Sequence, residues 1–251
     1  MELIGTSLLV VFALVLEGNR PISIGGPLVL LVVLSVILVA GTFNLYRSFE
    51  FGQLSVVSPL ASGYPALIVV LSVLVLKEPL TDTTGVGLAL TILGMVLVAR
   101  APVGGDPARP PKNARLGVLS ALVAFIAFAA FYFGLKFVVG PIPPITTAAI
   151  SRGVGALTVL GYLAAVRTFR APPRDLWPRL LGVGVLNSSA TALYNYGLVF
   201  GPSLAILATL SGLFSAVTVV LAVAFLGERL RRMQWGGVAA IFVGVALLSF
   251  F

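Results

Sequence analysis

Residues Gly201–Phe250 read GPSLAILATLSGLFSAVTVVLAVAFLGERLRRMQWGGVAAIFVGVALLSF, which is an apolar run, a short charged turn and a second apolar run. Residues Gly52–Arg100, GQLSVVSPLASGYPALIVVLSVLVLKEPLTDTTGVGLALTILGMVLVAR, show the same pattern at a constant offset of 150, with about a dozen identities and no gap. The identical pairs include Glu78 and Glu228, Gly87 and Gly237, and Gly94 and Gly244. A repeat of this length is too long for a solenoid unit. It is half of a protein, so we predict a duplicated bundle.

The composition assigns that bundle to a membrane. The chain is 59% apolar, only 10% charged, and has a mean hydropathy of +1.12, whereas soluble domains carry about 25% charged residues. There is no cysteine and no histidine, which excludes a disulfide framework, a thiolate metal site and an imidazole proton shuttle. We therefore expect no cofactor, no metal site and no catalytic residue. The net charge of +8 comes from short loops, as the positive-inside rule expects, and does not indicate nucleic acid.

Nine apolar runs follow one another along the chain, and we predict a helix for each, because only helices and closed barrels satisfy the backbone in lipid. They lack the alternating pattern of barrel strands. The runs are Leu3–Leu16, Gly26–Tyr46, Leu54–Leu76, Gly85–Ala99, Leu116–Val139, Ile145–Val166, Leu180–Phe200, Leu204–Leu226 and Trp235–Phe251.

The offset pairs the last four runs with the first four and leaves Leu116–Val139 without a partner. The first run, Leu3–Leu16, is also shorter than the roughly 17–25 residues that cross a bilayer. We therefore expect a further helix upstream. The predicted fold is an all-α polytopic membrane protein, an inverted-repeat helical bundle with nine of ten expected helices (4 + 5). Residues 1–100 form the first, N-terminally incomplete repeat of four helices, residues 101–115 a polar linker, and residues 116–251 the second repeat of five helices.

Several short motifs lie at matching places in the two halves. They are the turns Lys77-Glu78-Pro79-Leu80 and Gly227-Glu228-Arg229-Leu230, the glycines seven residues apart after each turn, the segments Tyr46–Gly52 and Tyr194–Gly201, the Phe133–Lys136 helix end and Arg152. Together they resemble the EamA-like family of ten-helix carriers in the drug/metabolite transporter superfamily. The resemblance implies a multi-pass transporter of the plasma membrane that moves a small metabolite or drug-like solute by alternating access between two inverted repeats.

Polar and aromatic side chains inside the apolar runs are the candidates for a substrate cavity, because an unpaired amide or hydroxyl costs several kcal/mol in lipid. The candidates are Asn44, Tyr46, Ser62, Tyr64, Phe128, Tyr132, Arg152, Asn187, Thr191, Tyr194, Asn195, Ser211 and Ser215. Close helix packing is the expected role of Gly87, Gly94, Gly237 and Gly244, since residues seven apart share a helix face and small residues let membrane helices approach.

Several of these interpretations have open alternatives. Phe128 and Tyr132 belong to an aromatic stripe with three- and four-residue spacing, which can stack a substrate or serve helix packing. Arg152 lies about two turns into its helix, where a charge marks a pathway by default, but its long side chain can also extend to the nearby interface. Glu78 and Glu228 lie at the ends of their runs. They either gate the carrier, or they satisfy turn donors or pair with Lys77 and Arg229 at the interface.

Other functions fit the chain less well. Ser, Thr and Tyr hydroxyls are abundant, but a membrane enzyme is less favoured because the sequence has no His, no Cys, no paired carboxylates within a span and no metal-ligand spacing. A non-transporting truncated fragment, or a partner subunit of a carrier, remains the alternative because one helix is expected upstream. The expected partners are a small-molecule substrate and the lipid bilayer, with a homodimer as an open possibility and no nucleic acid.

Orientation can be tested because the chain lacks cysteine. Alternating the runs puts twelve basic residues on one face, at Arg47 and within residues 100–115, 167–179 and 229–232, against Arg20, Lys77 and Lys136 on the other. This bias places the first face in the cytoplasm, whereas the family resemblance implies the reverse. We expect single cysteines at Ala108 and Ala171 to resist a membrane-impermeant thiol reagent in intact cells. Ready labelling of both would contradict the charge argument and support the family orientation.

Overall fold

All regular elements in the described part of the chain are helical. The structure is a computed structural model and describes residues 2–18, 24–52, 60–61, 63–79, 81–99, 113–167, 173–201, 203–211 and 232–248. Within these ranges the β-type pairing is limited to one isolated bridge between Val139 and Ile142. The all-α prediction is confirmed.

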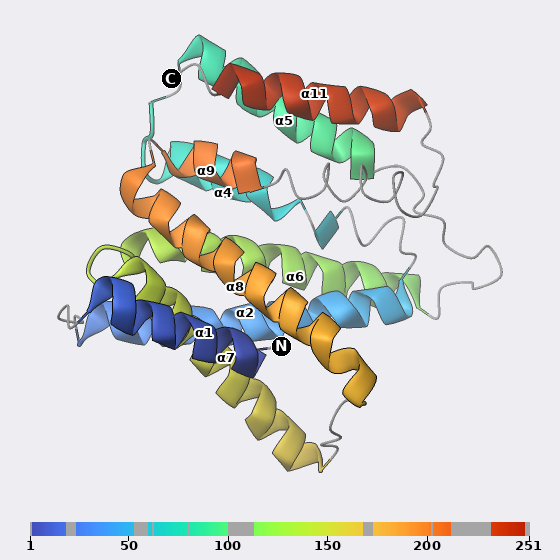
Figure 1. The fold of residues 1–251 in the computed structure, drawn as a ribbon. Helices are drawn as coiled ribbons and strands as arrows, with labels where there is room; N and C mark the ends of the chain where they lie inside the picture. Colours follow the sequence, from blue (N-terminus) through green and yellow to red (C-terminus); the bar gives the residue numbers. More distant parts are fainter. Residues whose placement is uncertain are drawn as a thin grey trace. The chain divides into compact units, whose positions relative to one another are not determined.

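The helices follow the apolar runs of the sequence (Figure 1). They are α1 (Glu2–Phe12), extended by the π-helix η1 (Ala13–Glu17), α2 (Gly26–Phe51), α4 (Tyr64–Leu74), α5 (Asp82–Ala99), α6 (Ala114–Gly134), followed by the 3₁₀ turn η2 (Leu135–Phe137), α7 (Pro144–Val166), the 3₁₀ turn η3 (Arg174–Leu176), α8 (Trp177–Phe200), α9 (Leu204–Ser211) and α11 (Arg232–Leu248). Among the described helices, those at Gly26–Phe51, Arg115–Phe137 and Pro144–Val166 are long and apolar enough to cross a membrane.

Some bounds differ from the predicted ones. Helix α2 continues beyond Tyr46 to Phe51, because Arg47 and Glu50 are compatible with a helix that extends past the apolar run. The runs Leu54–Leu76 and Leu204–Leu226 are described as helix over α4 and α9, and at residues 60–61. The polar linker from 101 to 112 and the turn around Glu228 lie outside the described residues.

The chain divides into two compact units, and each takes helices from both repeats. The first consists of Met1–Ala40 and Ala130–Gly201, the second of Gly41–Ala129 and Pro202–Phe251. The compact units therefore do not coincide with the sequence halves, because repeat-related helices pack on each other.

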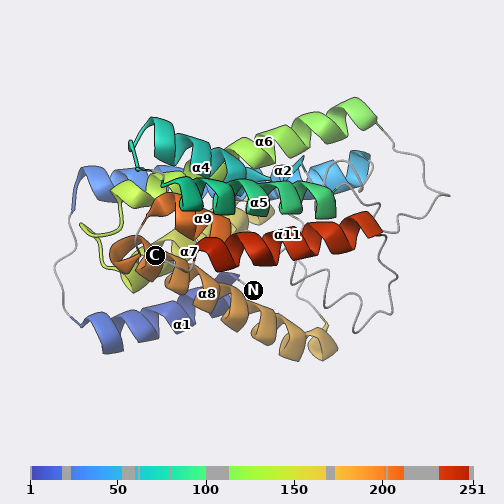
Figure 2. The same ribbon diagram turned by 90° about the horizontal axis from the view of Figure 1, so that it is seen from above.

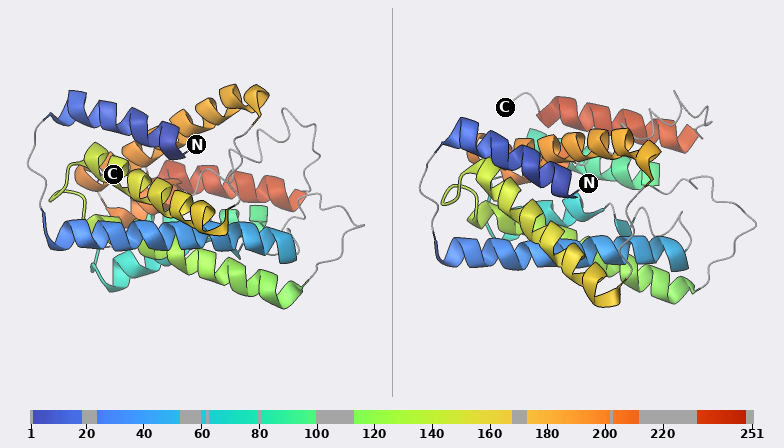
Figure 3. Two further views of the ribbon diagram at one scale, coloured as in Figure 1. Left: turned by 90° about the horizontal axis from the view of Figure 1, so that it is seen from below. Right: turned by 60° about the horizontal axis from the view of Figure 1, so that its bottom comes forward.

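In the first unit, α1 packs against α7 and α8 (Figure 3, where α1 is dark blue and α7 yellow). Leu9, Ile145, Ala148 and Ala149 form a buried apolar cluster between these helices. A Cβ at Gly5 would collide with the hydroxyl of Ser188, so the absence of a side chain at Gly5 allows α1 to lie directly on α8.

In the second unit, α5 and α11 lie side by side (Figures 1 and 2), and α4 packs on α9. A Cβ at Gly94 would lie 2.6 Å from the carbonyl oxygen of Gly237, and one at Gly244 would lie 2.7 Å from that of Gly87 and collide with the hydroxyl of Thr91. The backbones of α5 and α11 are therefore in direct contact at both ends of the interface between these two helices.

The repeat-related helices pack in opposite directions. Gly94 meets Gly237 while Gly87 meets Gly244, so α5 and α11 are antiparallel. The end of η1 meets the beginning of α7, and Glu78 after α4 meets the beginning of α9. Antiparallel contact between equivalent helices is what an inverted repeat requires, and the inverted-repeat helical bundle is confirmed.

The glycine contact between α5 and α11 can be tested with matched pairs. We expect Gly94→Ala and Gly244→Ala to lower the free energy of unfolding by about 1–3 kcal/mol, because each methyl group would force two backbones apart. Gly85→Ala on α5 and Gly236→Ala on α11 serve as controls, since a Cβ at either position meets nothing within 4 Å. Thermal melts in detergent measure the effect. Equal melting temperatures for the two pairs would show that close packing at Gly94 and Gly244 does not stabilise the bundle.

Candidate functional site

The first notable polar group is the Glu17 carboxylate at the end of η1. The π-helix is closed by Gly18, whose φ of +61° suits glycine because it has no Cβ. Only 6% of Glu17 is exposed. Its Oε1 accepts a hydrogen bond from the backbone N–H of Ile145 at 2.7 Å, and its Oε2 accepts two, from the backbone N–H and the hydroxyl of Thr146, at 2.8 and 2.7 Å.

The sequence around the start of α7 explains this contact. The first N–H groups of a helix have no partner within the helix, and the residue that usually caps them carries a side-chain oxygen. Here the capping position is Pro143 and the helix begins with Pro144, so neither residue can supply a cap. Glu17 therefore satisfies the donors of Ile145 and Thr146 from another helix.

The same arrangement occurs once more, at the start of α9. The Glu78 oxygens accept hydrogen bonds from the N–H groups of Leu204 and Ala205 at 2.8 and 3.0 Å. Lys77, with a φ of +53°, turns the chain after α4 so that Glu78 can reach α9. The Glu78 carboxylate thus satisfies backbone N–H donors, but these donors belong to α9 and not to the turn after α4 in which Glu78 lies. Glu228 and Arg229 lie outside the described residues.

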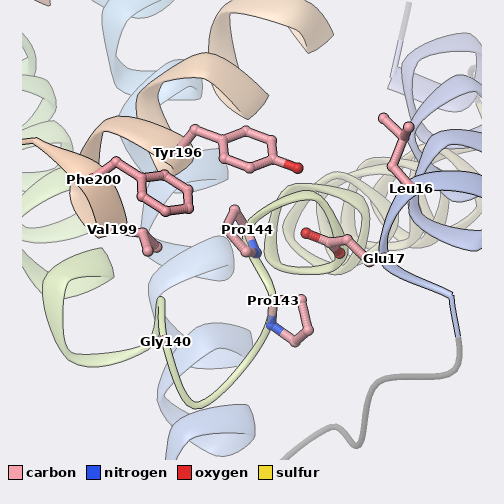
Figure 4. A pocket seen from close by; sticks show the side chains of 8 residues that line it. All are labelled: Leu16, Glu17, Gly140, Pro143, Pro144, Tyr196, Val199 and Phe200. Carbon is pink, nitrogen blue, oxygen red and sulfur yellow. The ribbon is translucent and has the colours of Figure 1, made fainter.

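A cavity of about 370 Å³ lies beside Glu17 in the first unit (Figure 4). It is lined by Leu16, Glu17, Gly140, Pro143, Pro144, Tyr196, Val199 and Phe200. The rings of Tyr196 and Phe200 stack with centroids 6.0 Å apart and an interplanar angle of 15°. Glu17 and Tyr196 are not among the cavity residues predicted from the sequence. The sequence did contain a signal for Glu17. This acidic residue follows one apolar run, and two prolines, Pro143 and Pro144, precede the run Ile145–Val166.

Arg152 of α7 binds the polar stretch of α8. Its Nη2 donates to the hydroxyl of Thr191 at 2.9 Å and to the carbonyl oxygen of Asn187 at 3.2 Å. The Thr191 hydroxyl also donates to that carbonyl oxygen at 2.9 Å. Arg152 is half-buried, while Asn187 is exposed. Arg152, Asn187 and Thr191 therefore lie together in the first unit.

Tyr194 and Asn195 are the most deeply buried candidates on α8. Tyr194 is 8% exposed and Asn195 1%. The Asn195 amide nitrogen donates to the carbonyl oxygen of Pro144 at 3.0 Å. Within the described part of the chain, the Tyr194 hydroxyl, the Asn195 Oδ1 and the Ser188 hydroxyl have no hydrogen-bond partner. The ring of Tyr132 stands edge-on to Tyr194 at 5.0 Å.

The remaining candidates belong to the second unit. Asn44 is half-buried and Tyr46 is 66% exposed. Tyr64 and Phe128 meet edge to face with centroids 5.7 Å apart, and the Ser211 hydroxyl donates to the carbonyl oxygen of Ala208. Ser62 and Ser215 lie outside the described residues. In the described residues there is also no group of three or more His, Cys, Asp or Glu side chains that could hold a metal ion.

Comparison with known proteins gives three findings. The model of a family described as "EamA-like transporter family" matches residues 2–100 and 115–250. An uncharacterized protein of Methanocaldococcus jannaschii is 40% identical over 68 residues, which are 27% of this chain and 50% of that protein. The chain thus spans about half the length of this curated relative.

The third finding is a solved structure, described simply as a crystal structure of a protein. It superposes with a TM-score of 0.77 and covers 98% of this chain and 83% of its own, at 17% sequence identity. At this level of identity the likeness supports the helical fold and carries no information on the transported solute.

Proposed function

Because the chain belongs to the EamA-like transporter family, whose members are integral membrane transporters, we propose that it carries a small polar solute by alternating access between its two inverted repeats. In such carriers the solute binds at the interface of the repeats, near the middle of the membrane. The family assignment supports transport rather than catalysis. We place the carrier in the plasma membrane, and a homodimer is the assembly to test first.

The observation that most supports a binding site is the buried Tyr194 hydroxyl, which has no hydrogen-bond partner among the described residues. A buried hydroxyl that lacks a hydrogen bond costs about 1–3 kcal/mol. Native structures therefore contain few such groups, and a functional role is one reason for retaining one. A bound solute with a hydrogen-bonding group would supply the missing partner. The Tyr132 ring beside Tyr194 adds an apolar surface for the rest of that solute.

Two further features agree with a polar organic solute. The Asn195 Oδ1 is also buried without a partner in the described residues, and it can accept a hydrogen bond from an N–H or O–H group. Arg152 supplies a cation that Thr191 and Asn187 orient. Amide, phenol and guanidinium groups together suit an amino acid, another small metabolite or a drug-like compound with several hydrogen-bonding groups.

The first test removes only the Tyr194 hydroxyl. We expect Tyr194→Phe to leave the melting temperature of the ligand-free protein equal or slightly higher, because an unsatisfied polar group is removed. We expect it to raise the KM for the transported solute about tenfold, through loss of about 1.4 kcal/mol of binding. A thermal-shift screen of metabolites first identifies the solute, and uptake into proteoliposomes then gives KM.

The control for this test is Tyr162→Phe, since Tyr162 is 54% exposed on α7 and outside the proposed site. It should leave KM unchanged. A Tyr194→Phe protein with unaltered uptake kinetics would exclude Tyr194 from the solute site and leave its hydroxyl as a core feature.

A second test concerns Arg152. We expect Arg152→Ala to reduce transport about tenfold or more, because it removes the charge and both hydrogen bonds to α8. If transport needs the positive charge itself, Arg152→Lys should retain part of the transport activity. Arg170→Ala and Arg174→Ala, in the basic stretch 167–179 of the sequence, should transport normally. Loss of activity in all three alanine variants would point to a general effect of positive charge.

A further inference from the structure

We propose that the cavity beside Glu17 binds an organic ammonium group. The cavity lies in the first unit, where η1, the start of α7 and the end of α8 meet. The inference rests on the charge and the aromatic surface of this cavity. It does not depend on which solute the proposed carrier moves.

The charge comes from Glu17, which is 6% exposed and accepts hydrogen bonds from neutral groups of Ile145 and Thr146. In the part of the chain that the structure describes, it forms no ion pair. A carboxylate offers about four acceptor positions, and the three donors of Ile145 and Thr146 leave one. The start of α7 contributes only about half a positive charge. The cavity therefore keeps a net negative wall that a cation can neutralise.

The opposite wall suits an organic cation. Tyr196 and Phe200 stack on each other, and both line the cavity with Val199, Pro143 and Pro144 (Figure 4). Aromatic faces attract ammonium groups with energies of about 0.5–2 kcal/mol. A bare Mg²⁺ or Ca²⁺ ion would need several oxygen ligands, whereas the side chains lining this cavity offer one carboxylate and one phenol. A carboxylate facing aromatic and proline side chains selects an alkylammonium over a metal ion.

The location gives two possible sources for such a group. η1 and α8 end here and α7 begins here, so the cavity lies at the level where spans meet the lipid headgroups. The ammonium can belong to a phospholipid headgroup or to a dissolved amine. Both present the same chemistry to Glu17, Tyr196 and Phe200.

The test uses the full chain in nanodiscs that contain only phosphatidylglycerol, which has no ammonium. Choline is the probe, and 3,3-dimethyl-1-butanol, which has the same shape without the charge, is its control. Calorimetry should show that choline binds at least about tenfold more tightly than the alcohol. Equal affinities would overturn the proposal, because the carboxylate would then contribute nothing.

Matched variants separate the site from the helix contact. Glu17→Gln and Glu78→Gln each replace a carboxylate that accepts two backbone N–H groups, so both should lower stability similarly. Only Glu17→Gln should weaken choline binding, by about tenfold or more, because Glu78 does not line this cavity. Tyr196→Phe should keep most of the affinity and Tyr196→Leu should lose it. Unchanged binding in Glu17→Gln, or equal losses in both Gln variants, would overturn the assignment.

A last comparison identifies the source of the ammonium. If a lipid occupies the site, adding phosphatidylethanolamine to the nanodiscs should weaken choline binding in the wild type by competition. If the natural ligand is a dissolved amine, choline affinity should be the same in both lipids. Either result supports an ammonium site, whereas choline that fails to bind in phosphatidylglycerol nanodiscs overturns it.

Discussion

The need to satisfy backbone N–H groups away from water governs how this bundle is assembled. Helices α7 and α9 begin at Pro144 and Leu204, and the first free N–H groups of each have no local cap except Ser203 in front of α9. Glu17 and Glu78 fill these positions from the ends of η1 and the segment after α4. Each unsatisfied buried donor would cost about 1–3 kcal/mol. The carboxylates therefore tie each first-repeat helix to the repeat-related helix that it packs against.

Glycine contacts complete this pairing along the helices. In lipid the hydrophobic effect does not drive helices together, so close van der Waals contact does. Gly94 against Gly237 and Gly244 against Gly87 bring the backbones of α5 and α11 into contact. In the first unit Gly5 has the same role against Ser188. The carboxylates thus join the end of η1 to α7 and the segment after α4 to α9, whereas the glycine contacts join α5 to α11 and α1 to α8.

The proposed solute site departs from this pattern of satisfied groups. Most buried hydroxyls on these helices donate to a carbonyl one turn back, as Ser35, Ser72 and Thr209 do. The Tyr194 hydroxyl, the Asn195 Oδ1 and the Ser188 hydroxyl, all on α8, have no such bond in the described residues. In the part of the chain that the structure describes, these three groups of α8 are the buried side-chain polar atoms left without a partner, which is consistent with a site whose partner is a ligand.

The composition determined the membrane class, and the 150-residue offset determined the duplication. The helical fold followed because hydropathy and periodicity are local properties of the sequence, and an apolar segment in lipid has to form a helix to satisfy its backbone. The glycine spacing led us to expect close packing at Gly94 and Gly244. The grouping of Arg152 with Thr191 and Asn187, and of Tyr132 with Tyr194, needed the tertiary structure, since residues on different helices share no sequence periodicity. The role of Glu17 was equally hidden: it depends on a helix that begins 127 positions after it with two prolines. Only the packing of α1 on α7 brings that carboxylate and those N–H groups together.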